Sequence, residues 1–142
     1  MRKIRSGVNV LDLLTFDSEP ILAFFLGEAG GDQVTDILEK IERGETQGYI
    51  NVINLTEVHY ILSRISPKVA EEKQRILRIW GLRVVPIEDN GLWREAAKMK
   101  CSHSLSLADA FAIATAKNFK TKLVVGGDKE FNNLGVELLR IR

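Results

Sequence analysis

Short runs of consecutive apolar residues alternate with helical segments along this chain, and this alternation limits the fold more than any other feature. The segments between the runs repeat apolar side chains at helical spacing, as Val34, Ile37, Leu38 and Ile41 do. Strands that are apolar throughout are typical of a parallel sheet covered on both faces. We therefore predict a three-layer α/β/α domain with a central parallel sheet of four or five strands. The strands are expected at 8–16, 49–53, 83–87, 122–125 and 136–140.

The starts of the helices are predicted from residues whose side chains cap helices. Ser18 precedes Glu19-Pro20, and proline is favoured in a first turn because its missing N–H needs no partner there. The predicted caps are Ser18, Asn54, Ser66, Asp89 and Ser106. They begin helices at 19–26, after Asn54, and at 67–80, 92–99 and 107–118; a further helix is expected at 33–43 and a helical turn at 129–132.

Length and composition set further limits. With 142 residues the chain fits one domain, predicted to span residues 1–142. The net charge of +1 gives no overall attraction to nucleic acid, so any basic surface must be local. The single cysteine, Cys101, excludes an intramolecular disulfide and suits a reducing cytoplasm. No signal-type apolar segment follows the basic stretch 1–7, and the run 11–16 is too short to cross a bilayer, so we expect a soluble cytoplasmic protein without membrane contact.

Four acidic residues are predicted to lie at one edge of the sheet. Asp17 ends the first strand, and Glu57 lies in the first turn of the helix after the second strand. Asp109 lies in the first turn of the helix that leads into the fourth strand, and Asp128 follows that strand. A helix that leads into a parallel strand starts at the carboxyl edge of the sheet, where open α/β sheets bind ligands. We therefore expect all four carboxylates at that edge.

Each of these acids also has a purely structural explanation. Glu57 follows Asn54 by three residues and Asp109 follows Ser106 by three, so both fit a capping box, and Asp17 and Asp128 fit turns. However, no Lys or Arg is near Asp17, Glu57 or Asp109 in the sequence. Carboxylates that converge without a counter-charge favour a hard divalent cation such as Mg²⁺ or Mn²⁺. By contrast, Glu88-Asp89 also follows a strand, and Asp89 is interpreted as a cap only.

Other residues suggest weaker alternatives. The spacing of His59, His103 and Cys101 does not match a metal site, and Gly126-Gly127 lacks the Lys-Ser/Thr of a phosphate-binding loop. Basic side chains can border the acidic edge and contact phosphates, although a solvated helix surface explains each of them equally well. These basic residues are Arg64, Lys68, Lys98, Lys100, Lys117 and Lys129.

Four segments resemble motifs of the PIN domain family, the nuclease fold typified by VapC-type toxins. The resemblance extends over nearly all of the chain after Asn9, and its third segment is the most specific. The segments are Asp17-Ser18 with Ile21-Leu22-Ala23 and Leu26-Gly27-Glu28, then NLTEVHYIL at 54–62, SLADAFAIATA at 106–116 and VVGGDKEF at 124–131.

The resemblance implies a function and a site. Asp17, Glu57, Asp109 and Asp128 would be catalytic and would bind Mg²⁺ or Mn²⁺, and the activity would be endonucleolytic hydrolysis of RNA that leaves a 5′-phosphate and a 3′-hydroxyl. The leading hypothesis is the toxin of a type II toxin–antitoxin pair. The alternatives are a PIN-fold module that binds RNA or protein with weak or no catalysis, and a PIN nuclease of RNA maturation. A cognate antitoxin and a homodimer are the expected partners; 24–26 (FFL) fits such a surface, and core packing explains it equally well.

The sequence departs from the family pattern in two places. The family commonly has Thr or Ser two residues before the fourth acid, where this chain has Gly126, so a hydroxyl near Asp128 is missing. Gly126→Ser is expected to raise cleavage, unless the glycine is required by a positive φ. The first acid also lies farther from the start of the sequence than is usual. Asp12 is rejected as that acid because the residues after Asp17 fit the motif better.

Overall fold

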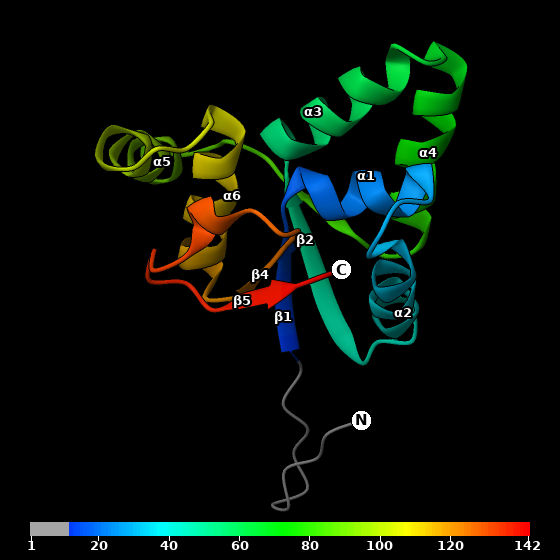
Figure 1. Cartoon of the computed structure of the whole chain (residues 1–142), viewed down its shortest axis with the longest axis horizontal. Helices are drawn as coiled ribbons and strands as arrows, with labels where there is room; N and C mark the ends of the chain where they lie inside the picture. The colour runs from blue at the N-terminus through cyan, green and yellow to red at the C-terminus, as the bar shows by residue number, and fades with distance from the viewer. Residues whose placement is uncertain (1–11) are drawn as a thin grey trace, which may run out of the picture.

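Five short strands form one parallel sheet in the computed structural model, which describes residues 12–142 (Figure 1). The strand order is β3-β2-β1-β4-β5, so the first strand is central. All four strand pairs are parallel, which confirms the predicted architecture with five strands. The part of the first predicted strand at 8–11 lies outside the described residues. The strands are β1 (Asp12–Phe16), β2 (Thr46–Asn51), β3 (Arg83–Val85), β4 (Lys122–Val125) and β5 (Leu138–Arg140).

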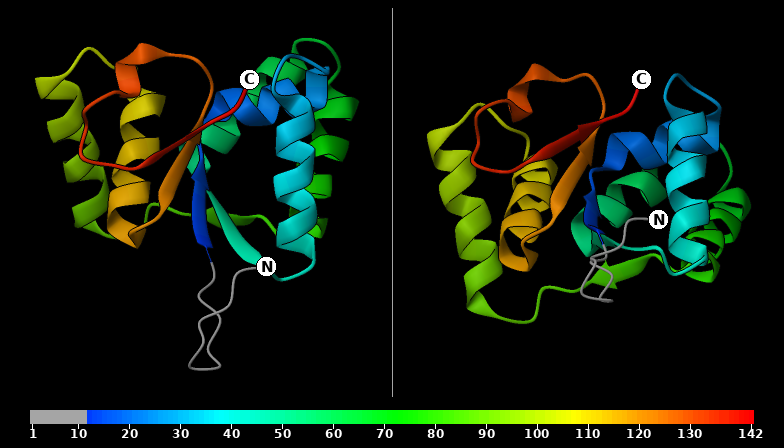
Figure 2. Two further views of the ribbon diagram at one scale, coloured as in Figure 1. Left: turned by 60° about the horizontal axis from the view of Figure 1, so that its bottom comes forward. Right: turned by 90° about the horizontal axis from the view of Figure 1, so that it is seen from below.

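Helices cover both faces of this sheet (Figure 2). One face carries α1 (Ser18–Leu26), α2 (Gly31–Glu42), α3 (Val52–Ser63) and α4 (Pro67–Ile79). The other face carries α5 (Asn90–Ser102) and α6 (Leu107–Phe119). A short 3₁₀ helix, η1 (Lys129–Phe131), lies in the connection between β4 and β5. Within residues 12–142, no helix is long and apolar enough to span a membrane.

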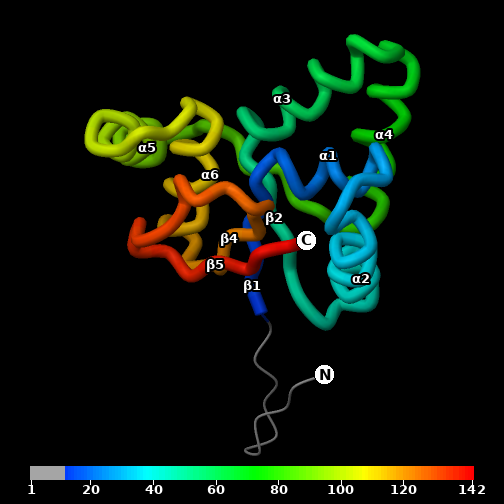
Figure 3. The backbone as a smooth tube through the Cα atoms, viewed as in Figure 1, coloured from blue at the N-terminus to red at the C-terminus, as the bar shows by residue number. Residues whose placement is uncertain are grey.

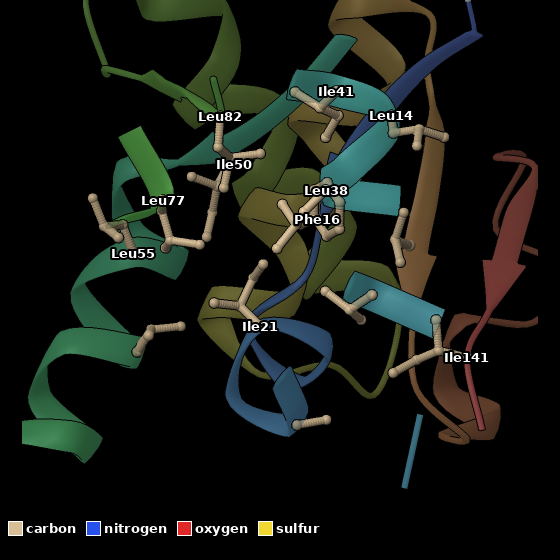
Figure 4. Close-up of a cluster of buried hydrophobic side chains, with 14 of the residues drawn as sticks. Leu14, Phe16, Ile21, Leu38, Ile41, Ile50, Leu55, Leu77, Leu82 and Ile141 are labelled. Carbon is tan, nitrogen blue, oxygen red and sulfur yellow. The ribbon is translucent and has the colours of Figure 1, made fainter. Parts of the chain in front are cut away.

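The sheet separates two hydrophobic cores because successive side chains of a strand point to opposite faces. Leu14 and Phe16 pack into the core beneath α1–α4, which Figure 4 shows from close range. Thr15, between them, is fully buried on the other side of β1, where its hydroxyl lies 2.7 Å from that of Thr121. Burying a side chain such as Phe16 fully contributes about 1.5–3 kcal/mol. This packing fixes β1, and therefore the residue that follows it.

Two of the predicted helix caps are wrong. Ser18 is the first residue of α1, and its hydroxyl donates to the carbonyl of Asn54 at 3.3 Å. The cap of α3 is Asn51, whose Oδ1 accepts from the N–H of Ile53 at 2.8 Å, so the helix starts three residues earlier than Asn54 predicts. Glu57 therefore lies in the second turn of α3, and the proposed Asn54–Glu57 capping box does not form. The caps predicted at Ser66, Asp89 and Ser106 are confirmed.

Several predicted boundaries also shift. Strand β3 ends at Val85 instead of residue 87 because Pro86 has no N–H to donate to the ladder. Helix α2 begins at Gly31 and α5 at Asn90, each two residues earlier than predicted, and β5 begins at Leu138. These changes leave the order of elements as predicted.

The last residues of the chain return to the turn between α1 and α2, as the tube in Figure 3 shows. The backbone N–H of Arg142 donates to Oε1 of Gln33, and Ile141 packs against Gly30. Gly30 has a φ of 91°, and its lack of a Cβ leaves the space that the Ile141 side chain occupies. The C-terminal segment therefore lies close to the carboxyl edge of the sheet.

Candidate functional site

The candidate site lies where the order of the strands reverses. From β1 the chain proceeds to β2 and β3 on one side, and then crosses to β4 on the other side of β1. Ligands of open α/β sheets bind at such a switch point, outside the carboxyl ends of the strands. The backbone N–H of Asp17 donates to the carbonyl of Val124 at 3.0 Å, which fixes Asp17 between the ends of β1 and β4. Asp12 lies at the opposite end of β1, in agreement with its rejection as a site residue.

Asp17 is a buried carboxylate among other acids. Its side chain is 4% exposed, and it stands at the N-cap position of α1 without accepting a capping hydrogen bond. Burial, followed by the charge of Asp109, raises the pKa of Asp17 to about 8, against a lowering by the backbone N–H of Ser18. The charges of Glu57 and Glu19 raise this pKa further. In the absence of a cation, the position therefore disfavours the ionised form of Asp17.

Asn54 is a site residue that the sequence analysis took for a helix cap. It is fully buried, and its Nδ2 donates to Oδ1 of Asp17 at 3.4 Å, to Oγ of Ser18 at 3.2 Å and to the carbonyl of Ala108 at 3.1 Å. One amide thus connects the starts of α1 and α6 with α3. Its Oδ1 is buried and has no hydrogen-bond partner within residues 12–142. A buried oxygen without a hydrogen-bond partner, next to a carboxylate, could bind a cation directly or accept a hydrogen bond from a water molecule bound to a cation.

Glu57 and Asp109 both face Asp17 from neighbouring helices. Glu57 is half-buried on α3, and Asp109 is half-buried in the first turn of α6. Asp109 also has the structural role foreseen for it: its Oδ2 accepts from the N–H of Ser106 at 3.3 Å, and its own N–H donates to Oγ of Ser106 at 3.0 Å. This capping box therefore holds the Asp109 carboxylate near Asp17.

Two further acids, Glu19 and Glu130, belong to this surface, and the sequence analysis missed both. Desolvation, then the charges of Asp128 and Asp109, raise the pKa of Glu19. Desolvation, a side-chain hydrogen bond with Asp109 and the charges of Asp109 and Asp128 raise the pKa of Glu130. The available signal was their spacing, because Glu19 follows Asp17 by two residues and Glu130 follows Asp128 by two.

The four predicted acids do not all interact with one another. Asp17 interacts electrostatically with Glu57 and Asp109, whereas the exposed Asp128 interacts with Glu19 and Glu130. For residues 12–142 as they stand, no three acidic, His or Cys side chains are close enough together to hold one metal ion. In the same range, none of the four predicted acids forms an ion pair with a basic side chain. The donor set nevertheless fits a hard divalent cation, because it consists of carboxylate oxygens without a counter-charge.

Steric contact with a neighbouring side chain, and not backbone conformation, explains why residue 126 is a glycine. Its φ is not in the left-handed region, so the predicted alternative of a positive φ is wrong. Instead, a Cβ built on Gly126 would overlap Oε1 of Glu19 and lie 2.5 Å from its Cδ. The carbonyl of Gly126 accepts from Nη1 of Arg140 at 2.8 Å, and Nη2 of Arg140 donates to Asn132 at 2.5 Å, which holds the loop that carries Asp128. The expected gain from Gly126→Ser did not take the Glu19 side chain into account.

The histidines and the cysteine lie apart from this surface. Nε2 of His59 pairs with Oε2 of Glu71 at 3.3 Å between α3 and α4. Nδ1 of His103 lies 3.2 Å from the carbonyl of Met99, at the end of α5, and Cys101 is exposed. Of the surface predicted at 24–26, Phe24 and Phe25 are half-buried against the core, where Phe24 also contacts Trp80, and Leu26 is exposed.

Comparison with known sequences identifies one domain family. The sequence profile of the PIN domain matches residues 14–137, which is most of the chain. No curated protein sequence is a significant match.

Solved structures of toxin–antitoxin proteins share the fold. The VapBC2 complex of Rickettsia felis, bound to a DNA fragment from its promoter, matches with a TM-score of 0.73 and 14% identity over 92% of this chain and 99% of its own. A toxin–antitoxin complex from Klebsiella pneumoniae matches with a TM-score of 0.70 and 18% identity over 89% and 96%. VapC20 of Mycobacterium tuberculosis, a toxin that cleaves the sarcin-ricin loop, matches with a TM-score of 0.67 and 16% identity over 89% and 98%. At these identities the likeness is one of fold.

Proposed function

Because the chain belongs to the PIN domain family, we propose that it is an endoribonuclease that depends on Mg²⁺ or Mn²⁺ and is the toxin of a type II toxin–antitoxin pair. The observation that carries the proposal is Asp17, a buried carboxylate whose pKa is raised by burial and by the charges of other acids. A charge in that position is costly unless a cation offsets it. The orphaned Oδ1 of Asn54 in the same place supports a cation site independently.

The roles of the residues follow from their positions. Asp17 and Asp109 are the proposed direct ligands, and Glu57 and Asp128 complete the site. Mg²⁺ or Mn²⁺ bound there would polarise the scissile phosphate, lower the pKa of a bound water molecule and offset the charge on the leaving oxygen.

Other side chains hold these acids in place. Asn54 restrains the Asp17 carboxylate, Ser106 restrains Asp109 through the capping box, and Arg140 restrains the loop before Asp128. All three contacts join groups of the protein to one another, so they would hold the acids in position for a cation.

RNA is the proposed substrate and an antitoxin the proposed protein partner. Support for RNA comes from the fold shared with a toxin that cleaves the sarcin-ricin loop, and support for an antitoxin from the toxin–antitoxin complexes with the same fold. We also propose a homodimer in the cytoplasm. A small antitoxin gene directly upstream of the coding sequence would support the toxin over a PIN nuclease of RNA maturation.

A cleavage assay tests the proposal. Purified protein is incubated with total RNA in Mg²⁺, in Mn²⁺ and in EDTA, and the products are separated on a denaturing gel. We expect cleavage with either cation and none in EDTA. Asp17→Asn is the inactive control, and Asp89→Asn, which changes an aspartate at another helix start, is the active one. Binding of RNA without cleavage in any cation would favour the alternative of a PIN-fold binding module.

A further inference from the structure

The contact between Glu19 and Gly126 joins the start of α1 to the loop after β4. Glu19 lies in the first turn of α1, two residues after Asp17, and Gly126 follows the last residue of β4. The Glu19 carboxylate occupies the space that any Cβ at position 126 would need, since such an atom would overlap Oε1 and lie 2.5 Å from Cδ. The main chain at 126 is itself buried and held by Arg140 through the carbonyl. Position 126 therefore admits glycine only while Glu19 keeps this orientation.

The Glu19 carboxylate, packed against Gly126, interacts electrostatically with the acids of the site. Of the acids around it, Glu19 is the one whose charge acts on Asp17 and which is itself influenced by both Asp109 and Asp128. It thus interacts both with the Asp17–Asp109 pair and with the more exposed Asp128. Glu19 also lines a pocket of about 340 Å³, together with Ile141 and Arg142.

We propose that Glu19 is a further acid of the cation site: Gly126 leaves the space for its carboxylate, whose charge takes the place of the missing side chain at 126 and strengthens the binding of a divalent cation on the Asp128 side. The inference rests on the proposed cation site. The two residues depend on each other, because the Glu19 carboxylate fits only while residue 126 has no side chain. The hydroxyl that the family pattern has near the fourth acid is replaced here by a carboxylate from a different element.

The test is the binding of Mn²⁺ to the purified protein, measured by calorimetry without RNA. Glu19→Gln keeps the shape of the side chain and removes its charge, and we expect it to lower the Mn²⁺ affinity about 10-fold, at the lower end of the loss that removal of a residue supporting metal ligands causes. Gly126→Ala is expected to cause a similar loss, because the new Cβ displaces the carboxylate. In a Glu19→Ala background, Gly126→Ala should cause no further loss, since the two changes remove the same interaction.

Glu28→Gln is the matched control, because Glu28 lines the same pocket but is not among the acids whose charges raise the pKa of Asp17. It should bind Mn²⁺ like the unmodified protein. The melting temperature in EDTA distinguishes charge from packing: Glu19→Gln should leave it unchanged or raise it, because one repulsive charge is removed.

Two outcomes overturn the inference. If Glu19→Gln binds Mn²⁺ as tightly as the unmodified protein while Asp109→Asn does not, then Glu19 only fills space and the proposed function stands. If the unmodified protein binds no Mn²⁺, the cation site and this inference fail together. Should Gly126→Ala not fold, Glu19→Gln alone decides.

Discussion

Asp17 and Asp89 occupy equivalent positions between a strand and a helix, but they differ in burial and in hydrogen bonding. Each follows a strand and stands at the N-cap position of the next helix. Asp89 is exposed, and its Oδ1 accepts from the N–H groups of Gly91 at 2.8 Å and Leu92 at 3.1 Å. Asp17 is buried, accepts no capping hydrogen bond, and has a pKa raised to about 8 by burial and then by Asp109. The comparison teaches that a cap is recognised by its partners, and a site residue by a charge that the fold leaves unsatisfied.

Replacement of Asp17 should have the largest effect of any change at these two positions. Asp17→Asn keeps the shape of the side chain and removes the proposed ligand charge, so we expect RNA cleavage in Mg²⁺ to fall about 100-fold or more, at or above the upper end of losses at supporting residues. The cleavage rate of the folded variant checks this. Asp89→Asn, which keeps a good N-cap, should cleave at the original rate. Equal losses in the two variants would contradict the distinction between them.

Asp109 combines the properties of both aspartates, so its replacement sharpens the comparison. Asp109→Asn can still accept the hydrogen bond from Ser106, and it removes the charge that faces Asp17. We expect the free energy of unfolding in EDTA to stay the same or to rise, while the Mg²⁺ affinity falls about 10- to 100-fold. Urea unfolding and calorimetry measure the two quantities. A large loss of stability with unchanged Mg²⁺ affinity would make Asp109 a cap alone, like Asp89.

Asp17 should make the largest contribution to the pH dependence of stability, above those of Glu19 and Glu130, whose pKa values are also raised. The pKa of Asp17 is about 8 in the folded protein and about 3.9 in the unfolded chain, so between these values the folded state holds the extra proton. The free energy of unfolding in EDTA should therefore be highest near pH 4 and fall as the pH rises to about 8, by up to about 1.4 kcal/mol per pH unit. Urea unfolding at pH 5, 6, 7 and 8 tests this. Asp17→Asn should lose this part of the slope and Asp89→Asn should keep it; a slope that persists in Asp17→Asn would assign it to other groups.

The smallest effect is expected for the loss of the Asp89 cap. Asp89→Ala removes two hydrogen bonds from the start of α5 and should lower the free energy of unfolding by about 1 kcal/mol. Thermal or urea unfolding gives this value, and Mn²⁺ binding should not change. If Mn²⁺ affinity fell as well, the start of α5 would be coupled to the site and Asp89 would not be a purely structural counterpart of Asp17.

The features predictable from sequence are those that depend on local interactions. The parallel sheet follows from the alternation of apolar runs with helices, and the caps at Ser66, Asp89 and Ser106 bond to N–H groups two or three residues away. The wrong caps are residues with distant partners. Ser18 bonds to a residue 36 positions along the chain, and Asn54 to one 54 positions along. A short-range pattern cannot contain such contacts.

The candidate site divides in the same way. The positions of Asp17, Glu57, Asp109 and Asp128 near the carboxyl edge could be inferred from the order of elements, and their role as cation ligands stays a prediction. The contribution of Glu19 could not be inferred, because it depends on a contact between the first helix and the loop after the fourth strand. Gly126 appeared as a missing hydroxyl for the same reason: its neighbour in space is far away in sequence.

The central position of β1 has a consequence for the order in which the protein is made. Strand β1 pairs with β4 on one side. The hydroxyls of Thr15 and Thr121, which are in hydrogen-bond contact, belong to residues that are 106 positions apart in the chain. During translation the N-terminal parts of a domain emerge first, and contacts of such long range form last. A nascent chain that ends before β4 carries Asp17, Glu57 and Asp109 but lacks Asp128. The acidic edge is therefore incomplete on the ribosome until most of the polypeptide has emerged, so a partly synthesised chain does not carry the whole site.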